Sequence, residues 1–343
     1  MRSLAKITLW ALERHEPLIN QISAADLKDC QAALPTASGT AVIKLGGKKA
    51  RVFRKAVGNY HAIAVSHEAD LVKSKRVMEL EVEIALASGN SIEAAIQRAE
   101  GRTRRLLHNL KSLTAKTTQE VYYIAQQQRL FGVDPKDAIK YVSGEIKEHS
   151  EDAAKAFIEI LKHQAAQKAE YTAFERLSGR LDHASAERHE VHKVLMNVFY
   201  LFFGDLLPKK IRVAVQPTRL QALFDYESVH VCLYYLAENA AKYIRPSSEL
   251  NVSVTDDGNG YAVIRFDMES LVIKREETEK IFEEGVSGSY AVDRGLNGAG
   301  IGLHLARAMA QLNRGTLTVI AGSPAGLGSD HARNTFILAL PMR

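Results

Sequence analysis

Three glycines alternate directly before an amphipathic segment near the end of the chain. Gly298, Gly300 and Gly302 stand in GAGIGLHLARAMA, residues 298–310. Glycine lets the backbone approach an anion closely, and a helix start offers free N–H groups and the positive end of its dipole. The pattern predicts a phosphate-binding loop; a glycine-rich turn into a core helix is the alternative interpretation. It is not a P-loop, because no Gly-Lys-Ser/Thr follows.

A second polar group lies in LAENAAKYI, residues 236–244. Asn239 and Lys242 are three residues apart and share a helix face, with Tyr243 one step further round. An amide oxygen can ligate Mg²⁺, and a lysine can meet a phosphate as a point charge. Taken alone, Asn239 is better explained as a polar residue on an exposed helix face.

Two acidic segments between these groups compete as ligands. DDGNG, residues 256–260, lies between the alternating runs LNVSV and YAVIRF. Asp-Gly and Asn-Gly at such a place are strong signals for a hairpin turn. Asp267 follows the second run and is the other candidate.

In order along the chain, these pieces resemble the ATP-binding domain of sensor histidine kinases. This is the Bergerat-type ATPase fold that gyrase, the Hsp90 chaperones and the mismatch-repair protein MutL share. LAENAAKYI resembles the N box of the family, EKIFEEGVS with Phe282 the F box, and GAGIGLHLARAMAQLNRGTLTV the G2 box with its strand. The resemblance covers about residues 187–343. It implies an α/β-sandwich, with strands in a mixed or antiparallel sheet and helices on one face, that binds ATP and Mg²⁺.

The resemblance also implies roles for single residues. Asp267 would accept a hydrogen bond from the adenine amino group, although Glu269 and Leu271 replace the family's glycines there, so a narrower pocket or weak binding is expected. That DDGNG is the true motif remains the alternative. Residues 285–297 would form the lid, with Arg294 either reaching a phosphate or solvated. The residues expected to bind the nucleotide are Asn239, which would also ligate the metal, Lys242, Tyr243, Asp267, Phe282, Arg294, Gly298, Gly300 and Gly302.

Two long helical patterns precede this region. The first is expected to be capped by Asn90 with Glu93 and to end near Gly132; the second starts at Asp134-Pro135. Both show heptad spacing, which predicts an antiparallel hairpin, and two hairpins from two chains would bury both seams in a dimeric four-helix bundle. The seam positions are Ile92, Ile96, Ala99, Thr103, Leu106, Leu110, Leu113 and Thr117, then Ile139, Val142, Ile146, His149, Ala153, Ala156, Ile160 and His163.

Histidine kinases carry their phosphorylated histidine on such a hairpin. His108 falls midway between two seam residues, on the outer face, and RRLLHNLKSL resembles the family's H box. The family usually has an acidic general base after the histidine; here Asn109 can hold the ring but cannot take its proton. A solvated helix residue is the alternative interpretation of His108. Tyr235 stands where other members keep a water-activating glutamate, and Glu238 is expected to point away from the site.

The composition limits the classes of protein to which the chain can belong. The chain has 343 residues, 46% apolar and 25% charged, which is typical of soluble globular proteins. Its two cysteines lack metal-ligand spacing, and neither a membrane segment nor a signal peptide is expected, so a cytoplasmic location is predicted. Three regions are expected. Residues 1–75 would form a small α+β input region, helical over 1–34 and β over 40–66, which resembles a PAS remnant. Residues 76–182 would form the dimerising and phosphoacceptor hairpin, and residues 187–343 the ATPase domain.

The sequence thus predicts a cytoplasmic, homodimeric histidine kinase of a two-component signal transduction system. It would bind Mg-ATP, phosphorylate His108 and pass the phosphoryl group to an aspartate on the receiver domain of a response regulator. One alternative is a regulatory dimer that binds ATP without autophosphorylation. Another is an ATP-gated scaffold or nucleic-acid-binding protein, although nucleic acid is disfavoured because no aromatic residues interleave the basic ones. Those basic residues are Lys48, Lys49, Arg51, Arg54 and Lys55.

Overall fold

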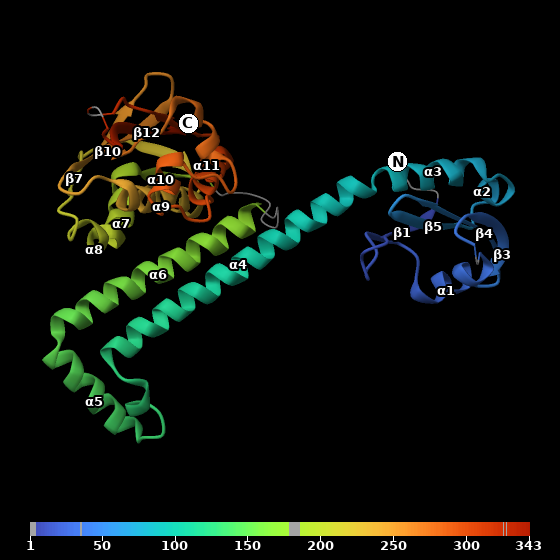
Figure 1. Cartoon of the computed structure of the whole chain (residues 1–343), viewed down its shortest axis with the longest axis horizontal. Helices are drawn as coiled ribbons and strands as arrows, with labels where there is room; N and C mark the ends of the chain where they lie inside the picture. Colours follow the sequence, from blue (N-terminus) through green and yellow to red (C-terminus); the bar gives the residue numbers. More distant parts are fainter. Residues whose placement is uncertain (1–4, 35, 178–185, 325, 327) are drawn as a thin grey trace. The chain divides into compact units, whose positions relative to one another are not determined.

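The computed structural model of the chain describes residues 5–34, 36–177, 186–324, 326 and 328–343. The chain divides into two compact units, Met1–Arg105 and Leu106–Arg343 (Figure 1). Among the helices of these described ranges, none is both long and apolar enough to cross a membrane.

The first unit is built on a five-stranded antiparallel sheet in the order β2-β1-β5-β4-β3. Apolar clusters cover both of its faces. Cys30 of α1 lies in one cluster, and Met78 and Val82 of α3 lie in the other. The unit therefore has its own core. Its elements are β1 Lys6–Ala11, β2 Ile19–Asn20, α1 Ala24–Ala33, β3 Gly39–Leu45, β4 Lys48–Val57, β5 Tyr60–Ser66, α2 Ala69–Lys73 and α3 Arg76–Ala87.

Two expectations for this unit have different outcomes. The strands over residues 40–66 are confirmed as β3, β4 and β5. The helical expectation for residues 1–34 is wrong, because β1 pairs along its whole length with β5 and only α1 is helical among the described residues there. KITLWA has no helical period and is buried on both faces, which hides a strand from period-based analysis.

The basic side chains of this unit largely serve its own structure. Arg51 donates from Nε to the Leu71 carbonyl at 2.8 Å, and Arg54 donates to the Leu34 carbonyl at 2.9 Å. Lys55 forms an ion pair with Glu83 of α3. Three of the five clustered cations thus hold helices and loops to the sheet, which weakens the nucleic-acid alternative.

Three helices follow, α4 Gly89–Ile124, α5 Pro135–Glu148 and α6 Ser150–Leu177. The predicted start of α5 is confirmed, because the Asp134 side chain accepts a hydrogen bond from the Lys136 N–H at 2.8 Å. In the second unit α6 returns beside α4, and Gln167 donates to the Thr114 hydroxyl at 3.2 Å (Figure 1). The hairpin of long helices is therefore present.

Its details differ from the prediction. The helix α4 ends at Ile124 rather than near Gly132, and Asn90 lies inside it instead of capping it. The Asn90 and Glu93 side chains both accept from the Tyr60 hydroxyl, a tertiary contact that competes with the capping box. The second helix is interrupted at His149, which caps α5 in a non-helical conformation.

The rest of the second unit is a mixed five-stranded sheet in the order β11-β12-β10-β9-β7, with α7, α9 and α11 packed in its core. The β7–β9 pair is parallel and the others are antiparallel. The expected α/β-sandwich is confirmed. The elements are β6 Glu187–Glu190, α7 Val191–Phe199, α8 Phe203–Leu206, β7 Arg212–Val215, β8 Gln221–Phe224, α9 Tyr226–Tyr243, β9 Glu249–Asp256, β10 Tyr261–Leu271, α10 Ser289–Asp293, α11 Gly302–Leu312, β11 Thr316–Ile320 and β12 His331–Pro341.

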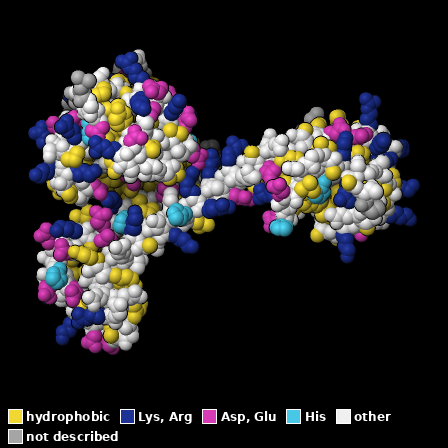
Figure 2. All heavy atoms as spheres, viewed as in Figure 1, with side chains coloured by type: hydrophobic (Ala, Val, Ile, Leu, Met, Phe, Trp, Pro, Cys, Tyr) yellow, Lys and Arg dark blue, Asp and Glu magenta, His cyan; other side chains and the backbone are white. Residues whose placement is uncertain are grey.

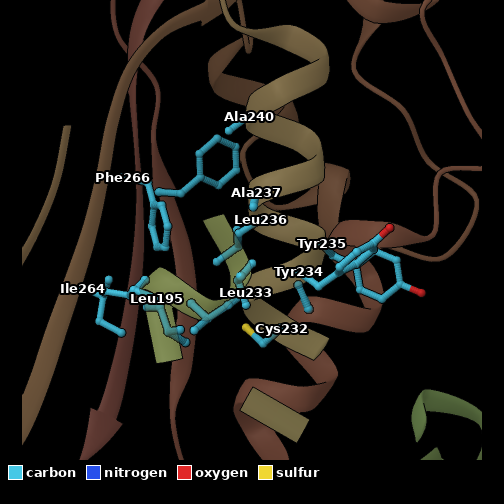
Figure 3. Close-up of a cluster of buried hydrophobic side chains, with 14 of the residues drawn as sticks. Leu195, Cys232, Leu233, Tyr234, Tyr235, Leu236, Ala237, Ala240, Ile264 and Phe266 are labelled. Atoms are coloured by element: carbon cyan, nitrogen blue, oxygen red, sulfur yellow. The ribbon is translucent and has the colours of Figure 1, made fainter. Parts of the chain in front are cut away.

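The helix α9 is buried over most of its length and connects the sheet with α6. Figure 3 shows Ile264 and Phe266 of β10 pointing towards α9, whereas Tyr234 and Tyr235 leave the helix on its other side. Asp225 caps α9 by accepting from the Ser228 N–H at 2.9 Å, as its position predicts. One short strand was not expected: residues 187–190 form β6, paired with β8, and α7 begins only after them.

Candidate nucleotide site

A cavity of about 490 Å³ opens beside α9 and the start of α11. Its size is that of a small-molecule site. Among the residues that line it are the glycine loop 298–302, the α9 residues Tyr235, Glu238, Asn239, Lys242 and Tyr243, and a surface that we call the β10 wall. The β10 wall consists of Met268, Ser270, Leu271, Val272, Ile273 and Phe336.

The glycine loop is confirmed as the entry to a helix, because Gly302 is the first residue of α11. A Cβ atom on Gly300 would lie 2.5 Å from the carbonyl carbon of Gly285, and the φ of Gly300 is +67°. A Cβ on Gly298 would lie 3.2 Å from the Lys242 ammonium. These glycines therefore leave the space in which the backbone and a lysine can surround an anion.

Asn239 and Lys242 both face this cavity, as their shared helix face predicts. The Asn239 amide nitrogen donates to the Tyr235 carbonyl at 2.9 Å, which leaves the amide oxygen for a ligand. Tyr243 lines the cavity too, and its hydroxyl donates to the Leu296 carbonyl at 3.3 Å. Within the described residues no group of three or more His, Cys, Asp or Glu side chains could hold a metal ion. The donors present fit Mg²⁺ that is held by one amide oxygen and by the phosphates of the nucleotide.

Asp267 lies elsewhere, which corrects the expectation that it contacts adenine. Successive residues of a strand point to opposite faces, and in β10 Phe266, Met268 and Ser270 are the buried ones. Asp267 therefore points to the outer face of the sheet, where it accepts a hydrogen bond from Thr335 of β12. It lines a separate, shallower depression with Arg245. The alternation was visible in the sequence and would have assigned Asp267 to this face.

The hairpin turn at DDGNG is confirmed, so this acidic segment is not a ligand loop either. Asp256 and Asp257 accept backbone hydrogen bonds from Gly258 and Asn259 at 2.8 Å each. The carboxylates thus close the turn, and Tyr261 starts the next strand beside it. The backbone N–H groups of Tyr261 and Asn259 both donate to the Asp257 carboxylate and hold its pKa below the usual value.

Phe282 and Arg294 are not among the residues that line the cavity. Phe282 is buried and its ring lies 3.6 Å from the guanidinium carbon of Arg307, so it fixes the segment before the lid. Arg294 forms an ion pair with Asp330. Other lid residues do line the cavity, namely Val286, Ser287, Gly288 and Ala291.

The same cavity reaches the helical hairpin, through Asn109 and Lys116 of α4 and Glu170 of α6. His108 is exposed, as its position between two seam residues predicts, and it directly precedes Asn109. His149 is exposed and His163 is half-buried in the single chain. Within this unit, then, the residue after the candidate phosphoacceptor and the glycine loop line one cavity.

Glu238 also lines the cavity, so the expectation that it points away from the site is wrong. Its side chain is exposed to solvent, and partial desolvation by the neighbouring protein raises the pKa of its carboxyl above the usual value. The Lys242 ammonium acts in the opposite sense. A carboxylate with a raised pKa is a better proton acceptor than an ordinary one.

Two further polar groups had no signal in the sequence. The Tyr235 hydroxyl donates to Glu170 at 3.1 Å, and burial raises the pKa of Tyr235 far above its usual value. Ser270 accepts a hydrogen bond at 2.9 Å from Asn334, which is completely buried. Both pairs join residues more than 60 positions apart in the chain, so only the tertiary fold reveals them.

Residues 224–343 match the family described as histidine kinase-, DNA gyrase B- and HSP90-like ATPase. No curated protein matches the sequence. Among solved structures, the mycobacterial sensor histidine kinase MprB is similar at 20% identity and a TM-score of 0.40, over 46% of this chain and 98% of that one.

Two other structures are similar over more of this chain. The Acinetobacter baumannii histidine kinase AdeS is 15% identical, with a TM-score of 0.40, over 69% of this chain and 98% of its own. Full-length ShkA in complex with AMPPNP is 16% identical, with a TM-score of 0.43, over 71% of this chain and 45% of its own. By the family match, residues 224–343 are an ATPase domain of the histidine kinase-, DNA gyrase B- and HSP90-like family.

Proposed function

We propose that this protein is a cytoplasmic, homodimeric histidine kinase that uses Mg-ATP to phosphorylate His108 and then passes the phosphoryl group to an aspartate on a response regulator. One observation carries the proposal: a single cavity is lined both by the glycine loop with Asn239 and Lys242 and by Asn109, the neighbour of His108. The proposed division into an input region 1–75, a hairpin 76–182 and the ATPase domain 187–343 belongs to the same proposal.

The roles of the chain's residues follow from their chemistry. The glycine loop and Lys242 would hold the triphosphate, and the Asn239 amide oxygen would ligate Mg²⁺, which would supply positive charge to offset the negative charge of the phosphates. The unprotonated ring nitrogen of His108 would attack the γ-phosphorus as the bond to the ADP oxygen breaks. The proton on the other ring nitrogen must then leave.

Asn109 cannot accept that proton, because an amide is not a base at neutral pH. Glu238 lines the same cavity and carries the raised pKa that suits a general base. We therefore assign proton removal to Glu238, while Asn109 orients the imidazole through a hydrogen bond. This division of roles replaces the single acidic residue that would otherwise follow the histidine.

A second function is favoured by the β10 wall. It carries no carboxylate among its described residues, and the residue after His108 is an amide. A chain with these features could bind nucleotide to set the position of the hairpin without transferring a phosphoryl group. Such a protein would be a regulatory dimer.

Incubation of the purified protein with Mg²⁺ and γ-labelled ATP separates the two functions. The kinase gives protein-bound label that is stable in alkali, labile in acid and absent from His108→Gln, with His149→Gln as the matched control that keeps it. Nucleotide binding without label contradicts the kinase and supports the regulatory dimer. The absence of nucleotide binding would rule out both.

A further inference from the structure

The β10 wall offers a nucleotide base a mostly apolar surface with one polar side chain. Met268, Leu271, Val272, Ile273 and Phe336 are apolar, and Ser270 is the exception. The carboxylates among the lining residues, Glu170 and Glu238, come from α6 and α9 instead. With the phosphates on the glycine loop and Lys242, this apolar wall is where a base ring would be buried.

The orientation of Ser270 is fixed from behind. Asn334 of β12 is completely buried, and its amide oxygen accepts from the Gly322 N–H at 3.1 Å. Its amide nitrogen donates at 2.9 Å to both the Ser270 hydroxyl and the Leu271 carbonyl. All the hydrogen-bonding groups of this amide are therefore engaged, and it holds the Ser270 oxygen as an acceptor.

A hydroxyl that already accepts one hydrogen bond still has its O–H donor and one lone pair. Adenine presents a donor amino group beside an acceptor ring nitrogen, whereas guanine presents an acceptor oxygen beside a donor ring N–H. A carboxylate, which only accepts, would select the first arrangement and repel the second. The Ser270 hydroxyl can match either one.

From this geometry we propose that Ser270 is the base-recognition residue of the site and that the site binds purine nucleoside triphosphates with little selectivity between ATP and GTP. The inference rests on the proposed nucleotide-binding function. The apolar residues beside Ser270 discriminate weakly between bases of equal size, because an apolar surface does not strongly reject an added polar group. Selectivity against pyrimidines remains, since a smaller ring leaves part of the wall uncovered.

Isothermal titration of the full-length protein with ATP, GTP and CTP in the presence of Mg²⁺ tests this. We expect the ATP and GTP affinities to agree within about tenfold and CTP to bind at least about tenfold more weakly. Ser270→Ala should weaken both purine nucleotides about tenfold, because Asn334 loses one acceptor and the base loses its partner. Ser253→Ala, which alters a serine of β9 outside the cavity, is the matched control and should change neither affinity.

Ser270→Asp provides the converse test and should favour ATP over GTP by at least about tenfold, since a carboxylate accepts from the adenine amino group and repels the guanine oxygen.

An ATP preference above about 100-fold in the wild-type protein overturns the inference. Equal binding of CTP also overturns it, because the protein would then recognise the triphosphate alone. If ATP binds strongly and selectively, the proposed function survives without this inference, whereas no binding by any of the three overturns both. The wild-type comparison does not depend on any variant folding.

Discussion

At the scale of single residues, the cavity separates side chains that merely share a sequence motif from those that share a site. Asn239, Lys242 and the alternating glycines meet there, whereas Asp267 does not. The difference lies in periodicity. Helix residues three positions apart lie on the same face, whereas successive residues of a strand point to opposite faces. Ser270 lines the cavity without belonging to a motif that the sequence revealed, and Glu238 lines it although it was expected to point away from the site.

Gly300 gives the sharpest test of the phosphate loop. Gly300→Ala should reduce ATP affinity at least about tenfold, because its Cβ would collide with Gly285 and displace the loop. Gly258→Ala is the matched control: Gly258 also has a positive φ, +74°, but open space around its Cβ position. It should cost about 1 kcal/mol of stability and leave ATP affinity unchanged. Equal affinities for the two variants, measured by titration with ATP, would contradict the assignment of the loop.

Glu238 makes the proposed phosphotransfer dependent on pH. Glu238 acts as a base only when it is deprotonated. Because its pKa is raised, the labelling rate should increase at a higher pH than it would with a carboxyl of ordinary pKa. Glu238→Gln should lower the initial rate of His108 labelling about 100-fold or more and remove the part of this increase that Glu238 causes. Labelling is measured between pH 5 and 8, with the exposed Glu187→Gln as control. An unchanged profile in Glu238→Gln would assign proton removal to another group.

At the scale of elements, α6 is attached to the ATPase domain by both apolar and polar contacts. Its alanines lie in the core of that domain, and Arg176 forms a 2.9 Å ion pair with Asp225, the residue that caps α9. Asp225 also donates its backbone N–H to the Asn313 side chain, which follows α11. One buried network therefore joins α6, α9 and α11.

Arg176→Met should destabilise this unit by about 3 kcal/mol, because removing one partner leaves the buried Asp225 carboxylate without its cation. Lys155→Met breaks the exposed pair with Glu151 within α6 and should cost less than about 0.5 kcal/mol. Urea unfolding of the full-length protein measures both. If the two variants lose the same stability, the Arg176–Asp225 contact does not join the elements in solution.

The sequence predicts elements well where one period dominates and poorly where contacts are nonlocal. Asp134 and the DDGNG turn carry local signals, and both behave as expected. The strand β1 pairs with residues of β5 that are 49 to 59 positions away, and β6 pairs with residues of β8 that are 31 to 37 positions away; neither strand was expected. The same holds in the cavity, where Asn239 and Lys242 were predictable and the Ser270–Asn334 pair was not.

At the scale of the whole molecule, the helical hairpin carries apolar side chains that are exposed to solvent. Ile139, Phe157 and Leu161 are 67%, 54% and 60% exposed in the single chain, and apolar surface is visible along α5 and α6 in Figure 2. Phe157 and Leu161 are four residues apart on one face of α6. Neither is a predicted seam position, and the seam residues Ala153 and Ala156 are already buried in the single chain. An exposed apolar pair of this kind indicates a protein–protein contact, and the proposed homodimer would cover it.

We expect sedimentation equilibrium to give a dimer for the wild-type protein and a monomer for Phe157→Glu/Leu161→Glu, because two charges in an apolar interface would have to be buried without partners. Ile320→Glu is the matched control, since Ile320 is 56% exposed but lies at the end of the edge strand β11. It should leave the dimer intact.

The monomeric variant should still bind ATP, because the cavity is lined by residues of one chain. A wild-type monomer, or a double variant that stays dimeric, would show that α6 does not form the dimer contact. A monomer that loses ATP binding would instead show that the second chain completes the site.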